Sequence, residues 1–110
     1  MIAENTQTQM RKGILEYCIL SIIGRNETYA SDIIAELKKA QLLVVEGTLY
    51  PLLTRLKNNG LLTYNWVEST SGPPRKYYTL SEEGKIVLAQ LDKTWQELSF
   101  AVETAVQKNK

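Results

Sequence analysis

The feature that most constrains this fold is a leucine pattern between Gly47 and Gly60. The apolar residues there have the i, i+3, i+4, i+7 spacing of a helix with one buried side, which they cover at about 100° per residue. They are Leu49, Leu52, Leu53 and Leu56. The opposite side carries Tyr50, Pro51, Thr54 and Asn58, with Arg55 and Lys57 on the two flanks. The pattern therefore predicts a half-buried helix whose outer side bears hydrogen-bonding groups, rings and cations.

A glycine and a proline set the limits of this helix. Gly60 is expected to end it, because glycine readily adopts the left-handed conformation that closes a helix. Pro51 is tolerable if the helix begins a few residues earlier, near Val45 to Gly47, since first-turn amides have no intrahelical acceptor. Our working hypothesis is that this helix reads a DNA groove and that the rest of the chain holds it there.

Length and composition predict one small domain. A chain of 110 residues buries a modest core, so help from a partner subunit is expected. No apolar run is long enough to span a membrane, and residues 1–9 lack the shape of a signal peptide. The single Cys18 cannot form an internal disulfide, which fits a reducing cytoplasm.

The residue types argue against catalysis and against a metal or other cofactor. The chain has no histidine and one cysteine, so a zinc site has almost no ligands to draw on and nucleophile–histidine catalysis is excluded. The net charge is only +1, which is weak for a nucleic-acid binder. Residues 46–78 nevertheless hold four cations against two carboxylates. This uneven charge is a hint of an anionic partner.

Two further helices are predicted before the leucine-patterned one. A polar lead-in over residues 1–9 precedes a helix over residues 10–23, and a second helix covers residues 29–40, capped by Thr28 or a neighbour. The first helix has two apolar faces, one with Leu15, Cys18, Ile19 and Ile22 and one with Met10, Ile14, Tyr17 and Ser21. Two apolar faces suit a helix that contacts both its own core and a partner. Cys18 is interpreted as an inert core residue.

After Gly60 the apolar period changes from helix to strand. Residues 62–67 alternate and predict a strand, residues 69–74 form a glycine- and proline-bearing turn, and residues 75–80 predict a second strand. Tyr77 and Tyr78 would lie on opposite faces. The two predicted strands and the turn between them form a β-hairpin, and the prolines stiffen its tip.

A last long helix is predicted from Ser81, whose hydroxyl suits an N-cap. Its apolar residues are spaced 3, 4, 3, 4, as in a coiled-coil seam. They are Leu88, Leu91, Trp95, Leu98 and Val102. This narrow seam favours a homodimer interface, and the alternative is a helix docked on its own domain.

The element order predicts an α+β, mainly helical fold: a winged helix-turn-helix with a long C-terminal helix. Residues 1–80 would form the DNA-binding domain and residues 81–110 the dimerisation helix. Three helices followed by a two-stranded wing make the leucine-patterned helix the recognition helix.

The motifs closely resemble those of the PadR family of bacterial transcriptional regulators, over most of the chain. The resemblance is carried by Gly47-Thr48-Leu49-Tyr50-Pro51-Leu52-Leu53, Gly60-Leu61-Leu62, Trp66 and Gly72-Pro73-Pro74-Arg75-Lys76-Tyr77-Tyr78. Many members begin the second helix with Tyr-Gly, and this chain has Tyr29-Ala30, for which we expect a local packing difference only. The resemblance implies a dimeric repressor that binds a palindromic operator in double-stranded DNA. The resemblance also implies a possible effector, since some relatives release DNA on binding phenolic acids and others on binding flat hydrophobic drugs. The short form, with one long C-terminal helix, resembles the subgroup of the multidrug-sensing members.

The predicted DNA-binding residues lie on the recognition helix and the wing. Thr48 and the first-turn amides suit phosphates, the outer side chains suit bases or sugars, and the flanking cations suit phosphates. The wing tip would meet the backbone or the minor groove. The full set is Thr48, Tyr50, Pro51, Thr54, Arg55, Lys57, Asn58, Gly72, Pro73, Arg75 and Lys76. The alternatives are a solvated helix face and a hairpin end with incidental charge.

A second predicted site concerns a small-molecule effector. Trp95 of two subunits could sandwich a planar aromatic compound by stacking. The lining residues would be Met10, Tyr17, Ser21, Trp95 and Ser99. The alternative is a packed dimer seam without a cavity. Two rival functions remain: a winged-helix module that binds protein and not DNA, and, more remotely, an enzyme.

Overall fold

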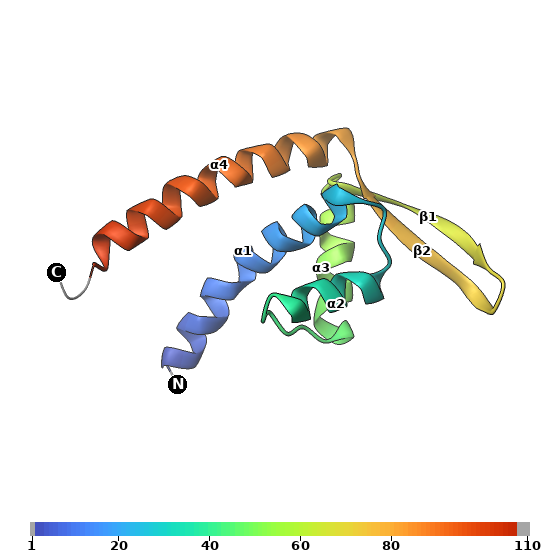
Figure 1. Ribbon diagram of the computed structural model, residues 1–110, viewed down its shortest axis with the longest axis horizontal. Helices are drawn as coiled ribbons and strands as arrows, with labels where there is room; N and C mark the ends of the chain where they lie inside the picture. The colour runs from blue at the N-terminus through green and yellow to red at the C-terminus, as the bar shows by residue number, and fades with distance from the viewer. Residues whose placement is uncertain (1, 108–110) are drawn as a thin grey trace.

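The computed structural model describes residues 2–107, and over this range the chain forms four helices and a two-stranded antiparallel sheet (Figure 1). The elements are α1 (Ile2–Arg25), α2 (Ala30–Lys39), α3 (Glu46–Asn58), β1 (Leu62–Ser69), β2 (Gly72–Leu80) and α4 (Glu82–Ala105). This order and the long last helix confirm the predicted fold class. The division into two units at residue 80 stays a prediction.

Helix α3 is built as its leucines predict. Leu49, Leu53 and Leu56 are buried, and Leu52 is half-buried. Gly60 has a φ of 81°, and the amides of Gly60 and Leu61 donate back to carbonyls of the last turn. Pro51 lies inside the helix, where it removes the N–H that the carbonyl four residues earlier would accept. The helix tolerates this because that carbonyl lies near its exposed N-terminal end.

The core lies between α1, α2, α3 and the base of the hairpin. Its buried side chains come from all of these elements. They include Ile19, Leu20 and Ile23 from α1, Ile33 and Leu37 from α2, the α3 leucines, Leu62 and Tyr78. Half-buried Cys18 packs against this core, as predicted, and burial raises the pKa of its thiol, which disfavours the reactive thiolate.

Helix α1 begins earlier than expected. The predicted lead-in is wrong, because residues 2–9 are helical, while Met1 lies outside the described residues. Polar side chains gave no helical period there, but Thr6 and Thr8 donate hydroxyl hydrogen bonds to the carbonyls of Ile2 and Glu4. All residues from 2 to 13 are exposed, so this first half of α1 lies outside the core.

Helix α2 is capped by a neighbour of Thr28. Tyr29 is the N-cap, and its amide donates to the Asp32 carboxylate at 3.2 Å. Thr28 instead pairs with Tyr78 through two backbone hydrogen bonds of 3.2 and 2.9 Å. These bonds attach the start of α2 to the hairpin.

The hairpin turn is shorter than predicted. Strand β2 begins at Gly72 and includes both prolines, so the predicted turn over residues 69–74 is too long. The pairing register shifts between Val67 and Ser69, so the two prolines lie opposite an irregularity of the ladder, where a missing N–H is tolerated. The register pairs Tyr64 with Tyr78 and Trp66 with Lys76.

Helix α4 is attached to the end of α3 by a short hydrogen-bonded junction. The Ser81 hydroxyl donates to the Gly60 carbonyl at 2.6 Å and accepts from the Gly84 amide at 2.9 Å. The Ser81 amide donates to the Leu61 carbonyl at 3.0 Å. Gly84 passes so close to that carbonyl that a Cβ would clash with its oxygen. Ser81 therefore caps α4, as predicted, and also joins it to α3.

The molecule is elongated, with α1 and α4 projecting together on the side away from the hairpin (Figure 1). Its extents are 58 × 32 × 23 Å and its radius of gyration is 16.0 Å, against about 13 Å for a compact chain of this length. No helix within residues 2–107 is long and apolar enough to cross a membrane.

Candidate DNA-binding surface

The outer side of α3 forms an open hollow. Its lining residues are Tyr50, Pro51, Thr54, Arg55, Asn58 and Asn59. All six are exposed, so the side chains predicted to face away from the leucines do so. Asn59 is an addition, and its position as the C-cap of α3 explains why the helical pattern did not include it.

The two flanking cations of α3 have partners on different elements. Arg55 forms an ion pair of 3.2 Å with Glu16 of α1, a carboxylate that is largely buried. Lys57 lies over the ring of Tyr64, 5.6 Å from its centroid. A carboxylate therefore lies beside the charge of Arg55, whereas the contact of Lys57 is with an aromatic ring of the hairpin.

The N-terminus of α3 is less open to an anion than expected. The Thr48 amide donates to the Val45 carbonyl at 3.0 Å and is not free. Glu46 adds a carboxylate in the same first turn. Negative charge at this position competes with a phosphate for the positive end of the helix dipole. A phosphate contact by Thr48 would thus rely on its exposed hydroxyl.

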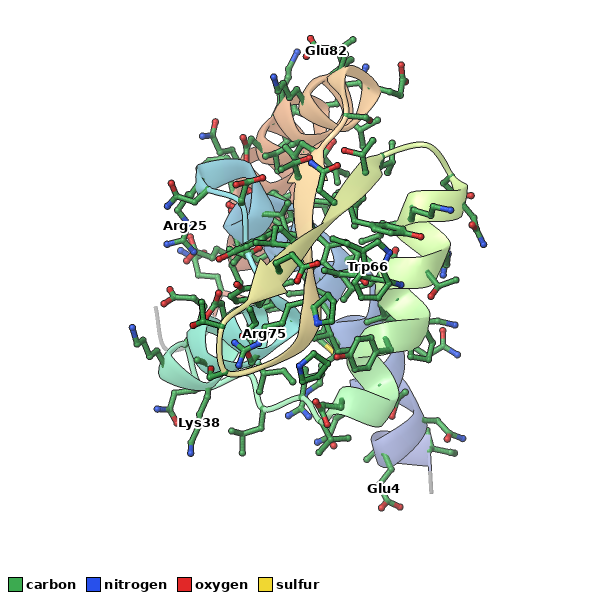
Figure 2. All side chains as sticks on the ribbon, turned by 90° about the vertical axis from the view of Figure 1, so that its right-hand side faces the viewer. Glu4, Arg25, Lys38, Trp66, Arg75 and Glu82 are labelled. Carbon is green, nitrogen blue, oxygen red and sulfur yellow. The ribbon has the colours of Figure 1, made fainter. Side chains whose placement is uncertain are left out.

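The wing cations lie on opposite faces of the hairpin, because they are consecutive residues of a strand. Arg75 lies over the Tyr29 ring at 4.9 Å from its centroid, and Tyr29 stacks on Tyr77 at 3.9 Å. Lys76 lies over Tyr64 at 4.5 Å and over Trp66 at 5.3 Å. Figure 2 shows Arg75 on the α2 side of the hairpin and Trp66 on the α3 side. Each cation is therefore held by aromatic rings.

The hairpin, α2 and α3 enclose a cleft of about 440 Å³ that joins these groups. It is lined by Tyr29, Ala30, Ser31, Glu46, Tyr50, Trp66, Pro74, Arg75, Lys76 and Tyr78. Sequence reasoning did not assign Tyr29 or Trp66 to the site. Strand alternation could have found Trp66, which lies two residues beyond Tyr64 on the same face. Gly72 and Pro73, predicted as the wing tip, are exposed at the end of the hairpin.

Two tyrosines of strand β2 have raised pKa values, which favours their neutral form. Hydrogen bonding to Tyr29 raises the pKa of Tyr77, and burial raises the pKa of Tyr78. Tyr78 is a buried core residue, and Tyr77 on the opposite face of β2 is half-buried against Tyr29. The charge of the cleft therefore comes from Arg75, Lys76 and the opposing Glu46.

The residues predicted for an effector site are spread over several environments. Met10 is exposed on α1, and Ser21 lines a hollow between α1 and α2 together with Cys18 and Leu37. The Tyr17 hydroxyl donates to Asp92 of α4 at 2.6 Å, and this bond raises the pKa of Tyr17 to about 12. The Ser99 hydroxyl donates to a backbone carbonyl of its own helix, that of Gln96.

The predicted α4 seam has two parts. Leu88 and Leu91 are half-buried against the core of their own chain. Trp95, Leu98 and Val102 are 46%, 51% and 49% exposed, respectively. The seam residues of α4 that follow Asp92 are thus exposed enough to contact a partner. Among residues 2–107, no group of three His, Cys, Asp or Glu side chains is placed to hold a metal ion.

Comparison with known proteins gives one consistent result. Residues 19–90 match the Transcriptional regulator PadR-like family. A PadR-like transcription factor from Bacteroides fragilis is 58% identical, with 93% of this chain and 99% of that one covered and a TM-score of 0.80. A PadR-like transcriptional regulator from Bacillus cereus is 36% identical, with 92% and 99% covered and a TM-score of 0.82.

A third structure, a PadR family regulator from Eggerthella lenta, is 31% identical, with 98% and 95% covered and a TM-score of 0.83. These similar proteins are transcriptional regulators, and their likeness extends over the recognition helix, the wing and most of α4. The chain therefore belongs to the PadR-like family of transcriptional regulators, and its family role is regulation through DNA binding.

Proposed function

We propose that the protein is a cytoplasmic repressor that binds a palindromic operator as a homodimer. The observation that carries this proposal is the surface formed by the outer side of α3 and the wing cations, Arg75 and Lys76. An exposed helix face with amide, hydroxyl and ring groups suits the major groove, and cations on an adjacent hairpin suit phosphates or the minor groove. The proposed contacts are the α3 and wing residues predicted from the sequence.

A second copy is proposed to bind through α4. The exposed apolar seam of Trp95, Leu98 and Val102 supports this, as does the exposed first half of α1. A two-fold dimer would present two α3 helices about 34 Å apart, the spacing of one turn of DNA. Binding of the second helix then becomes intramolecular and greatly strengthens the complex.

The test is selection of bound sequences from random double-stranded DNA. We expect a palindrome to be enriched and its binding to weaken steeply with salt, because neutralised phosphates release counterions. Enrichment of no sequence would contradict a specific repressor and favour a protein-interaction module.

The wing is tested by replacing Arg75 and Lys76 together with Ala. We expect weaker binding and a salt slope lower by about two, one for each phosphate that the wing no longer neutralises. Lys85→Ala with Lys93→Ala removes the same charge from α4 and serves as the matched control. Equal losses for both pairs would show that overall charge, and not the wing, matters.

The proposed effector is a planar aromatic compound at the α4 seam. The support is the exposed indole of Trp95, which lies three residues after Asp92 on α4, the partner of the Tyr17 hydroxyl. Such compounds should quench Trp95 fluorescence and lower operator affinity, and Trp95→Ala should abolish both effects, leaving only Trp66 emission. A broad set of compounds without either effect would favour a closed seam.

A further inference from the structure

Trp66 is an exposed tryptophan that the core does not require. Along the same face of β1, the exposed fraction rises from 2% at Leu62 to 62% at Trp66, because the hairpin extends beyond the core. Its cross-strand partner is Lys76, whose ammonium lies 5.3 Å from the indole and 4.5 Å from the Tyr64 ring. Figure 2 shows Trp66 between the hairpin and α3. A large ring and a cation therefore share the wall of the cleft that faces α3.

The cleft has the chemistry that a sugar-phosphate chain would need. Deoxyribose offers an apolar C–H surface that a ring can cover, and the next phosphate offers a charge that an ammonium can pair with. The cleft combines exposed Trp66 and Tyr50 with two cations, Arg75 and Lys76, against the single carboxylate of Glu46. Its openness to solvent suits a chain that passes through it.

We propose that Trp66 and Lys76 hold the sugar-phosphate strand that separates the major groove entered by α3 from the minor groove met by the hairpin. The indole packs on a deoxyribose and the ammonium pairs with the adjacent phosphate. This inference rests on the proposed function, to which it adds Trp66 as a binding residue. Because sugar and phosphate are the same in every sequence, the pair contributes affinity and register, and the α3 side chains retain the reading of bases.

The position of Lys76 over two rings favours binding of its ammonium to a DNA phosphate. The ammonium of Lys76 is only weakly bound by the exposed Trp66 ring and the half-buried Tyr64 ring, so a phosphate can replace these contacts. The rings also restrict the freedom of the long side chain before DNA binds. Arg55 is the contrast, because it is ion-paired with the largely buried Glu16 and must break that pair to bind a phosphate fully. Lys76 is thus the more available cation beside α3.

Affinity is measured for the selected operator and for a random-sequence duplex of the same length, at several salt concentrations. Trp66→Ala should weaken binding to both DNAs by about tenfold, the size of an aromatic contact with nucleic acid, with an unchanged salt slope. Trp66→Phe should restore much of the loss, and Lys76→Gln should lower the slope by about one. Asn65→Ala, an exposed neighbour on the opposite face of β1, should bind as the wild type does. Thermal melting checks that each variant is folded.

A direct probe uses 5-fluorotryptophan and fluorine NMR of the full chain. The resonance absent from the Trp66→Phe spectrum belongs to Trp66 and should shift with both DNAs. Full affinity of Trp66→Ala together with a stationary Trp66 resonance would overturn this inference while operator binding by the wild type stands. A loss confined to the operator would make Trp66 a base reader and refute the sugar contact. A wild type that binds no DNA would refute both the inference and the proposed function.

Discussion

At the scale of single residues, two left-handed positions close the helices of the helix-turn-helix. Gly60 ends α3 with a φ of 81°, and Gln41 ends α2 with a φ of 66°. In both, the next residue's amide donates to a carbonyl of the last turn: Leu61 to Leu56, and Leu42 to Leu37. Gly60 was predictable because glycine favours this conformation, whereas Gln41 was not, since its side chain gives no such signal.

Gln41→Gly should therefore stabilise the protein. The substitution relieves the Cβ strain of a left-handed residue, partly offset by the greater freedom of glycine in the unfolded chain, for a net gain of about 0.5–1 kcal/mol. Urea denaturation measures this free energy. Gly60→Ala is the reciprocal control and should destabilise by about 1 kcal/mol. If Gln41→Gly lowers the free energy of unfolding, the contacts of the glutamine side chain stabilise the fold by more than the left-handed backbone strain destabilises it.

At the scale of elements, the sequence was informative wherever one side is buried. The leucine spacing predicts α3, strand alternation predicts the hairpin, and Ser81 predicts the start of α4. The first turns of α1 and the two prolines of β2 were mispredicted, because exposed helix and edge strand carry no apolar period. The cation–ring contacts of Arg75 and Lys76 could not be predicted, since their partners on other elements meet them only in the folded chain.

The attachment of α4 to the end of α3 depends on Gly84. In Gly84→Ala, the added methyl would clash with the Leu61 carbonyl, so α4 must move away and strain the Ser81 hydrogen bonds. We expect a loss of roughly 1–3 kcal/mol in the free energy of unfolding, as for other overpacked sites. Circular dichroism during urea unfolding measures it.

Gly13 provides the matched control for this glycine. It lies in the exposed part of α1, where a methyl added at its Cα would meet no other side chain within 4 Å. Gly13→Ala should therefore stabilise by up to about 1 kcal/mol, through helix propensity alone. If both substitutions had the same effect, the close approach of α4 to Leu61 would have no energetic consequence.

At the scale of the whole molecule, the described chain is more extended than a self-contained domain. Residues 2–13 and the last turns of α4 lie outside the core, and Tyr17–Asp92 is a hydrogen bond that links the two projecting helices. Trp95, Leu98 and Val102 on this part of α4 are about half exposed, and Phe100 is 73% exposed. A second copy covering them would account for the elongated shape.

Leu98→Glu tests this explanation of the shape. A carboxylate in the α4 seam would be buried in a dimer, so the variant should sediment as a monomer while its far-ultraviolet circular dichroism is retained. Its operator affinity should fall by about 10²–10⁴, because the second recognition helix no longer binds intramolecularly. Gln96→Glu adds the same charge to another side of α4 and should leave both properties unchanged. A dimeric Leu98→Glu protein would exclude this seam.

Because α4 is attached at the Ser81 junction, a small tilt of the helix there produces a large displacement of its far end. The helix has 24 residues, so its far end lies about 36 Å from the pivot. A tilt of about 10° at Ser81 therefore moves that end by about 6 Å over this length. In a dimer joined along α4, a movement at the far end of this helix would likewise be transmitted to α3 through the junction. A small sliding of the two seams would turn each α3 about its own C-terminus, changing the angle at which both helices meet DNA.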